Sequence, residues 1–320
     1  MNGELFYWVL NMSIAGTVVG GVILLLQRML RLPKRLIFAL WIVPLVRLWM
    51  PFGADSKYSL MGLIRRVTVR PVEYMEGLPH INVEASMMNV IGVAESYFPI
   101  VYKKNVYQTV FGTAEVIWLV VAVAAVLAGV AIYLSTAAEL KSAKPIRNRI
   151  YRSDKVTSPM VFGVIRPRIL LPEIPAMGAV GDSTETFGAE DEQSYVLLHE
   201  QTHIRRMDNL WRVIAVLTRC LHWFNPFIWL FLKRFLADME LACDEKVISI
   251  YGEEQCKEYA SALLDYEEQK VLFASGFGGA GIRLRIKEIL SYRRLTVFSA
   301  VGFLVLLAVV VITLLTNAAG

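Results

Sequence analysis

The chain has 320 residues, of which 56% are hydrophobic and only 19% are charged. Because soluble domains average about a quarter charged residues, this balance argues against a soluble cytosolic enzyme and against a disordered chain. The net charge of +5 is too small a surplus for direct binding of nucleic acid. Cys220, Cys243 and Cys256 form no CxxC pair, which indicates a reducing compartment for the region that holds them.

Four apolar runs approach the length needed to cross a bilayer, which takes about 20 helical residues. They are Phe6–Leu26, Leu36–Phe52, Val116–Leu134 and Leu295–Leu315. The second run is short, and Pro44 is expected to bend it. Its Arg47 is expected to extend toward the membrane interface rather than to pair inside a helix bundle. The sequence therefore predicts a mainly α-helical polytopic membrane protein with four transmembrane helices.

Basic residues cluster beside three of these runs. The clusters follow the first run at 28–35, follow the third at 141–152 and precede the fourth at 283–294. The positive-inside rule places all three clusters in the cytoplasm, so both termini are expected outside. The resulting segments are two transmembrane helices in 1–52, an extracellular loop at 53–115, a third transmembrane helix at 116–134, a cytoplasmic domain at 135–294, a fourth transmembrane helix at 295–315 and an extracellular tail at 316–320.

The expected cytoplasmic domain mixes strand and helix signals. Residues 150–171 contain the β-branched runs VFGV and RIL around a turn, which predicts short strands, and 194–206 has helical character. Residues 210–236 are expected to form two apolar helices, with Asn225 as an N-cap and Pro226 at the first helical position. The fold predicted for this domain is α+β.

Three tryptophans lie in the apolar stretch 210–236, namely Trp211, Trp223 and Trp229. Tryptophan flanked by arginine is typical of a membrane interface, which favours a hairpin pressed against the inner leaflet. A buried core hairpin is the alternative.

The string His199-Glu200-Gln201-Thr202-His203 carries the chemistry. On a helix the two histidines are four residues apart, so both imidazoles project from one face and can share a zinc ion. Glu200 borders the same face and is expected to act as the general base that takes a proton from water. The alternative is two surface histidines on an amphipathic helix.

A catalytic zinc site needs a third protein ligand. Glu240 and Asp244 form another pair four residues apart on a predicted helix, and we expect Glu240 to be the ligand and Asp244 to orient an imidazole from behind. Glu245 is the nearest competitor for the ligand role. Cys243 could bind zinc as a thiolate, but we place it off the face shared by Glu240 and Asp244.

Two further polar residues near this region are assigned structural roles. His222 stands between Leu221 and Trp223, so packing or an interfacial position is favoured over contact with a reaction intermediate. Asp208, five residues after His203, is expected to cap the next helix.

At these residues the chain resembles the BlaR/MecR family of membrane metallopeptidases, the signal transducers of inducible β-lactam resistance. The resemblance rests on SPMVFGVIRPRILLP at 158–172, HEQTHIRRMD at 199–208, HWFNPFIW at 222–229 and ELACDE at 240–245. It implies a gluzincin-like zinc endopeptidase domain controlled across the membrane. The family's HExxH motif carries over to His199, Glu200 and His203, and its downstream acidic motif to Glu240 and Asp244.

The sequence departs from that family at its end. The best-known members continue into an extracellular penicillin-binding sensor domain, for which the five residues after Leu315 leave no room. Either the chain is a truncated piece of such a protein, or it belongs to a short branch that senses something else or works with a separate sensor. We therefore do not expect this chain to bind β-lactams, and the candidate partners besides membrane lipid are a separate sensor protein and a second copy of the chain.

The resemblance also implies cleavage of a cytoplasmic DNA-binding repressor and self-cleavage. The glycine-rich tract at 274–281 allows the extended backbone that a protease cleft requires, and Ser275, Gly276 and Phe277 are the candidate self-cleavage segment. Met160–Val164 is a candidate strand for holding a substrate peptide, with an ordinary core strand as the alternative. The competing functions are a quality-control membrane metalloprotease and a non-catalytic zinc-bearing sensor or scaffold.

Overall fold

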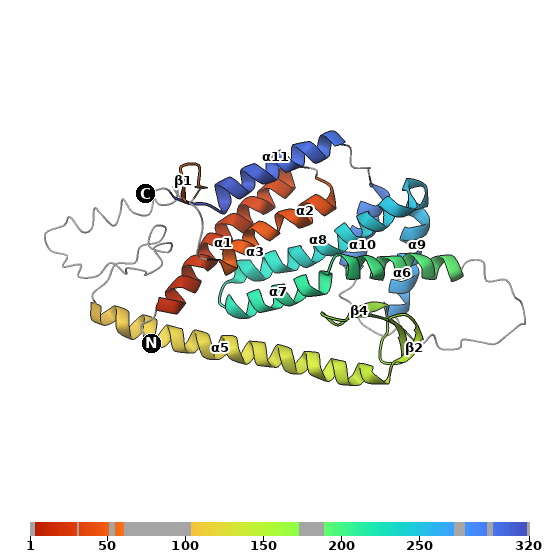
Figure 1. The fold of residues 1–320 in the computed structure, drawn as a ribbon, viewed down its shortest axis with the longest axis horizontal. Helices are drawn as coiled ribbons and strands as arrows, with labels where there is room; N and C mark the ends of the chain where they lie inside the picture. The colour runs from red at the N-terminus through yellow and green to blue at the C-terminus, as the bar shows by residue number, and fades with distance from the viewer. Residues whose placement is uncertain are drawn as a thin grey trace, which may run out of the picture.

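The structure is a computed structural model that describes residues 4–30, 32–50, 55–60, 104–172, 189–271, 279–292 and 297–318. Figure 1 shows an elongated body of helices with a small sheet at one end and both chain termini at the other. The prediction of a mainly helical protein with a small β component is confirmed.

Three helices form the N-terminal part of the bundle. They are α1 (Glu4–Met29), α2 (Lys34–Leu40) and α3 (Ile42–Trp49). The predicted second span is thus two short helices, and the break falls where Pro44, which has no N–H, cannot donate to the carbonyl of Leu40. Arg47 is only 3% exposed because α3 packs against α1 and α7, so the preferred prediction of a side chain extending to the interface is wrong.

Close helix packing in this bundle depends on two glycines of α1. A Cβ atom on Gly16 would lie 2.4 Å from Leu48 of α3, and one on Gly20 would lie 2.4 Å from Phe231 of α8. A side chain at either position would force the side chain of Leu48 or Phe231 to move.

The next helix, α5 (Lys104–Glu139), has 36 residues and is about 54 Å long. It begins 12 residues before the predicted third span, so it includes residues 104–115 of the segment predicted as an extracellular loop. The helix extends past the apolar run because no proline stands between Pro99 and Pro145 to end it. A short 3-10 helix at Leu140–Ser142 follows.

Two of the described helices are long and apolar enough to cross a membrane, at Leu5–Met29 and Val110–Ser142. The last helix, α11 (Val297–Leu314), is apolar but shorter. Near the termini β1 (Asp55–Ser56) pairs in parallel with β6 (Asn317–Ala318), which ties the segment after α3 to the C-terminal end.

The sheet at the opposite end contains four strands. They are β2 (Lys144–Arg147), β3 (Ile150–Ser153), β4 (Met160–Phe162) and β5 (Arg168–Pro172), in the order β2-β3-β5-β4. Strands β3 and β5 are parallel and the other pairs antiparallel, so β4 is an edge strand. The short strands predicted within 150–171 are confirmed.

The remaining helices carry the candidate site. They are α6 (Ala189–Arg205), α7 (Asp208–Leu221), α8 (Pro226–Tyr251), the 3-10 helix η2 (Glu253–Gln255), α9 (Cys256–Val271) and α10 (Gly279–Leu290). The N-cap prediction is confirmed, because Asn225 Oδ1 accepts the Phe227 backbone N–H at 3.0 Å. Helix α6 begins earlier than expected, at Ala189.

The α7–α8 hairpin belongs to the helix bundle. Ala215, Ile228, Phe231 and Phe235 are buried in the same apolar core as residues of α1, α2 and α3. The buried alternative is therefore correct for this face of the hairpin, which shares one apolar core with α1, α2 and α3. Other apolar side chains of the hairpin remain exposed, including Val216, Phe227 and Leu230.

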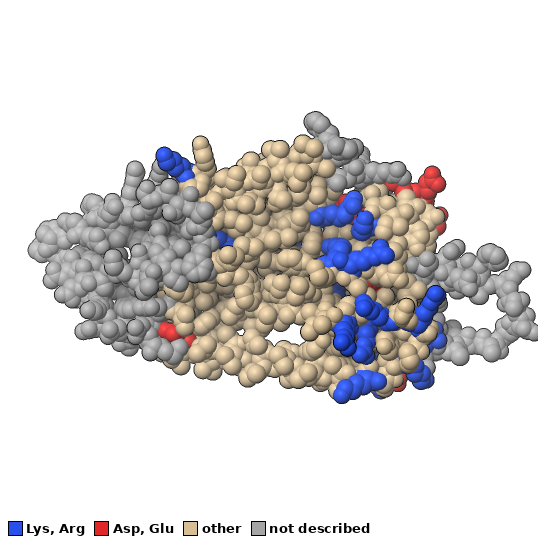
Figure 2. All heavy atoms as spheres, viewed as in Figure 1, with Lys and Arg blue, Asp and Glu red and all other residues tan. Residues whose placement is uncertain are grey.

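Figure 2 shows that Lys and Arg side chains gather at the sheet end of the molecule, beyond a broad middle region without charged side chains on this face. The described parts of all three basic clusters contribute to this end, because α2, β2 and α10 lie there in Figure 1. The grouping expected from the sequence is thus present in three dimensions.

Candidate metal centre

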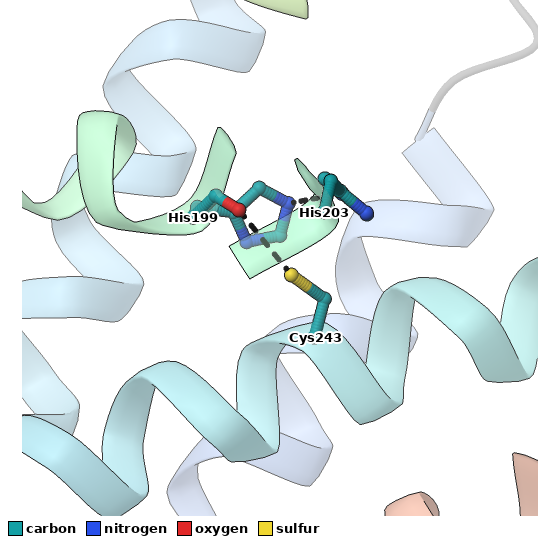
Figure 3. Close-up of side chains that lie close together, drawn as sticks. All are labelled: His199, His203 and Cys243. Atoms are coloured by element: carbon teal, nitrogen blue, oxygen red, sulfur yellow. Dashed lines mark hydrogen bonds between the residues drawn. The ribbon is translucent and has the colours of Figure 1, made fainter. Parts of the chain in front are cut away.

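Helix α6 brings the two histidines of the HExxH string together. The Nε2 atoms of His199 and His203 lie 3.0 Å apart, and both side chains are buried. The imidazoles meet because residues four apart stack on one face of a helix. Figure 3 shows the rings of His199 and His203 side by side, next to the helix that carries Cys243.

Glu240 of α8 lies near the same two nitrogens. Its Oε2 lies 3.6 Å from His199 Nε2 and 3.5 Å from His203 Nε2. Ligand atoms about 2.0–2.1 Å from a tetrahedral zinc ion stand about 3.3 Å from one another. The three separations of 3.0, 3.5 and 3.6 Å therefore have the size that a shared zinc ion requires.

Cys243 lies at this site as well, contrary to the expectation that it is off the face. Its Sγ is within 4.8 Å of a ring nitrogen of each histidine, and it donates to the His199 backbone carbonyl at 3.5 Å (Figure 3). The expectation failed because residues 240, 243 and 244 follow the i, i+3, i+4 pattern and therefore share one helix face. The described residues thus offer a thiol as well as a carboxylate as third ligand.

One carboxylate forms a hydrogen bond with the Nδ1 atom of His203. Asp208 Oδ2 lies 2.6 Å from His203 Nδ1, and Asp208 is fully buried. The prediction that Asp208 caps α7 is wrong, because Met207 occupies the N-cap position and no side chain caps this helix. Met207 has a φ of +55°, and this left-handed turn returns Asp208 to the histidine five residues earlier.

This bond changes the proton affinity of His203. Burial lowers the pKa of the imidazole, but the hydrogen bonds to Asp208, Cys243 and Glu240 together outweigh it, and the pKa is well above its usual value. Since a metal binds only the neutral imidazole at Nε2, protons and metal compete for this nitrogen.

Three residues from three other helices form a hydrogen-bonded group on the Nδ1 side of His199. The Tyr259 hydroxyl lies 2.9 Å from His199 Nδ1 and donates to Asp244 Oδ1 at 2.7 Å. Asp244 Oδ1 is itself 3.2 Å from Nδ1. A neutral imidazole that presents Nε2 to a metal carries its proton on Nδ1, so Nδ1 donates into this pair. Asp244 therefore lies where the sequence analysis expected it.

Arg285 of α10 completes this group. Its Nε and Nη2 donate to the two oxygens of Asp244 at 2.8 and 2.7 Å. Burial opposes ionisation of Asp244, but the Arg285 guanidinium outweighs it and holds the pKa of the carboxyl well below its usual range. Arg285 Nη2 also lies 3.4 Å from His199 Nε2, so a positive charge stands beside the candidate site.

Comparison with known proteins identifies the family of this chain. Residues 7–289 match the family described as BlaR1 peptidase M56. The chain belongs to this family. It is therefore related to membrane metallopeptidase signal transducers, and the resemblance inferred from the sequence is confirmed.

Two curated relatives of the M56 chain show how far the similarity extends. The regulatory protein BlaR1 of Bacillus licheniformis is 33% identical over 149 residues, which are 44% of this chain and 23% of that protein. The methicillin resistance mecR1 protein of Staphylococcus aureus is 28% identical over 112 residues, which are 35% of this chain and 18% of that protein. The matched stretches thus span less than a quarter of these relatives.

The other carboxylates near this M56 site have distinct partners. Arg212 Nη2 donates to Glu240 Oε1 at 2.7 Å, which leaves Oε2 directed at the histidines. Glu200 is buried, and no side chain among the described residues forms a hydrogen bond or ion pair with its carboxylate. Glu245, the competing ligand, accepts instead from Arg35 Nε at 2.8 Å and faces α2.

Two other sequence predictions concern His222 and the candidate self-cleavage segment. His222 is buried and its Nε2 contacts the Leu48 carbonyl at 3.2 Å, so the packing role is confirmed. The candidate self-cleavage residues Ser275, Gly276 and Phe277 lie outside the described residues.

The proposed peptide-holding strand β4 is already partly occupied. Asn209 Nδ2 donates to the carbonyls of Val161 at 3.3 Å and Gly163 at 2.8 Å, at the C-terminal end of this strand. A substrate peptide that added to this edge would have to displace these bonds.

Four residues of the site were not predicted from the sequence to belong to it: Asp208, Tyr259, Arg285 and Arg212. For Asp208 a signal was present, since an acid directly after a metal-binding helix can fold back onto it. Tyr259 and Arg285 stand 60 and 86 residues from His199, and no local pattern connects them.

Proposed function

We propose that this chain is a membrane-embedded zinc endopeptidase of a BlaR/MecR-like signalling system. Its substrate is a cytoplasmic transcriptional repressor, and the chain also cleaves itself within Ser275–Phe277. The observation that carries the proposal is the triangle of His199 Nε2, His203 Nε2 and Glu240 Oε2, with edges of 3.0 to 3.6 Å and Glu200 on the same helix.

The proposed membrane arrangement has four spans with both termini outside. They are α1, the α2–α3 pair, α5 and α11, and the gluzincin-like site lies at the cytoplasmic end. The positive-inside rule supports this orientation, because the described basic side chains gather at the sheet end of the molecule. The α7–α8 hairpin enters the bundle from the cytoplasmic side and returns, as its place in the core of α1–α3 supports.

The proposed chemistry uses few residues. When bound, zinc supplies a Lewis acid that polarises the scissile carbonyl and makes water more acidic. Asp208 orients His203, and Asp244 with Tyr259 orients His199, so that each imidazole keeps its Nε2 lone pair directed at the ligand point. Glu200 takes the proton of the attacking water and delivers it to the leaving amine. Arg212 holds the free oxygen of Glu240.

A Glu200→Gln substitution tests this assignment. The full chain is co-expressed with candidate repressors encoded nearby, and repressor cleavage and the zinc content of the purified protein are measured. Loss of a general base costs about 10²- to 10⁴-fold in rate. We expect Glu200→Gln to abolish detectable cleavage and to retain zinc, because Glu200 is not a ligand.

Glu254→Gln is the matched control, because Glu254 is an exposed carboxylate of η2. It should cleave as the unmodified chain does. Zinc without cleavage in either protein would indicate a structural site in a sensor or scaffold. Cleavage of misfolded membrane proteins but of no repressor would indicate a quality-control protease. A cut near Phe277 that persists in Glu200→Gln would contradict self-cleavage.

A further inference from the structure

A cavity of 940 Å³ lies between α5, α7 and the turn that joins β4 to β5. Its volume is near the upper end of the range of about 300–1,000 Å³ for small-molecule sites. His199, Glu200 and His203 do not line it. Arg212 alone belongs to both places, since it lines the cavity and donates to Glu240. The cavity is therefore separate from the metal centre and touches it at one residue.

The walls of the cavity are apolar along most of their length. Helix α5 contributes Val126, Val130 and Tyr133, and α7 contributes Val213, Val216 and Leu217. On α5 the apolar lining runs from Val126 to Ala137, which is about 17 Å along the helix axis. Half of a bilayer hydrocarbon core is about 15 Å thick. The apolar lining thus has the depth of one leaflet.

Positive side chains stand where the apolar lining ends. Lys141, Arg166, Arg168 and Arg212 all line the cavity. Arg168 stacks over the ring of Tyr151 at 5.2 Å, and Arg212 pairs with Glu240. Within the described part of the chain, Lys141 and Arg166 have no ion-pair partner. Their charge is available to a negatively charged group held at this end.

We propose that this cavity binds a phospholipid with an anionic headgroup. The acyl chains lie between α5 and α7, and Lys141 and Arg166 contact the headgroup phosphate. A free phosphate would leave the apolar lining, about 17 Å long, unfilled. A zwitterionic lipid would bring its own cation to a place that already holds several positive side chains. The site extends the proposed function, because it lies at the membrane end of a cytoplasmic catalytic centre and reaches Glu240 through Arg212.

Lipid retention by the purified full chain tests this proposal. The chain is delipidated in detergent and incubated with phosphatidylglycerol or with phosphatidylcholine of the same acyl chains, and bound lipid is counted by native mass spectrometry. We expect one tightly bound phosphatidylglycerol and at least about fivefold weaker binding of phosphatidylcholine, since each cation near a lipid surface favours anionic lipid by roughly that factor. The double variant Lys141→Gln/Arg166→Gln should remove the preference.

A second variant tests the apolar part. Gly129 lines the cavity and has no atom within 4 Å of the position that a Cβ would take, so Gly129→Leu fills the cavity without a backbone clash. Gly21→Leu on α1 is the control, because Gly21 is equally open and lies outside the cavity. Gly129→Leu should lose the bound lipid and keep its zinc, and Gly21→Leu should keep both.

Either of two results would overturn the proposal. One is equal retention of phosphatidylglycerol and phosphatidylcholine by the unmodified chain. The other is undiminished phosphatidylglycerol binding by Gly129→Leu with normal zinc content. For the charge variant, Lys257→Gln on α9 is the control, because Lys257 is exposed and does not line the cavity.

Discussion

The two histidines of the metal centre differ in the hydrogen-bond partners of their Nδ1 atoms. His203 depends on Asp208, five residues away across a single turn, whereas His199 depends on Tyr259, Asp244 and Arg285, which come from α9, α8 and α10. The His203 side is complete once α6 and α7 form. The His199 side is complete only when three further helices have docked, and it alone has a cation 3.4 Å from a ligand nitrogen.

The largest effect is expected at Glu240, the residue that faces both histidines. Glu240→Gln should weaken zinc binding by more than about 100-fold, because it removes a ligand rather than a supporting group. Zinc affinity is measured by competition with a chromophoric chelator. Cys243→Ser is the matched variant, and it should change the affinity less than about threefold. The reverse order of effects would make Cys243 the third ligand.

The next effect is expected on the His199 side. Asp244→Asn should weaken zinc binding by about 30- to 100-fold, because it weakens the support of His199 and leaves the charge of Arg285 unbalanced beside the site. The double variant Asp244→Asn/Arg285→Gln should recover part of this loss when measured in the same competition. No recovery would mean that the cation does not act on the metal.

A smaller effect is expected on the His203 side. Asp208→Asn should weaken zinc binding by about tenfold, since the amide can still accept from His203 Nδ1. The cation that loses its partner is Arg206, whose Nε lies 3.5 Å from Asp208 Oδ1 and which keeps a hydrogen bond to the Met239 carbonyl. Asp154→Asn, an exposed aspartate after β3, serves as control and should leave the affinity unchanged. If Asp208→Asn proved costlier than Asp244→Asn, the asymmetry between the two histidines would be reversed.

The smallest effect is expected for Tyr259→Phe. This change removes one hydroxyl, but Asp244 Oδ1 remains 3.2 Å from His199 Nδ1 and can accept directly. We expect a loss of zinc affinity of about two- to fivefold, measured by chelator competition, with the free energy of unfolding lowered by about 1 kcal/mol for the lost hydrogen bonds. A loss as large as that of Asp244→Asn would show that Tyr259 is the main acceptor.

The features that could be predicted from the sequence are those that depend on residues close together in the chain. The HExxH face, the Asn225 cap, the short strands and the Pro44 break depend on neighbours within a few residues, and these predictions agree with the structure. The placement of the α7–α8 hairpin and the roles of Tyr259 and Arg285 depend on which helices dock together. Composition gives an apolar helix the same signature whether it faces lipid or a protein core, so these features needed three-dimensional information.

The predictions for Cys243 and Asp208 were wrong for a different reason. Both lie close in sequence to residues that were assigned correctly, so the information was local. Cys243 shares the helix face of Glu240 by ordinary helical spacing. Asp208 was assigned to the commonest role of an acid at a helix start, although the left-handed Met207 turned it toward His203.

Helix α8 runs without interruption from the Asn225 cap in the bundle core to the metal centre (Figure 1). From Pro226 to Glu240 it is about 21 Å long. Because a continuous helix hardly compresses along its axis, a sliding movement at its Asn225 end displaces Glu240 by the same amount. Displacements of about 1 Å at a catalytic centre can cost about 100-fold in rate. The carboxylate that completes the candidate zinc site is therefore mechanically coupled to the packing of α8 against α1, α2 and α3 in the bundle core.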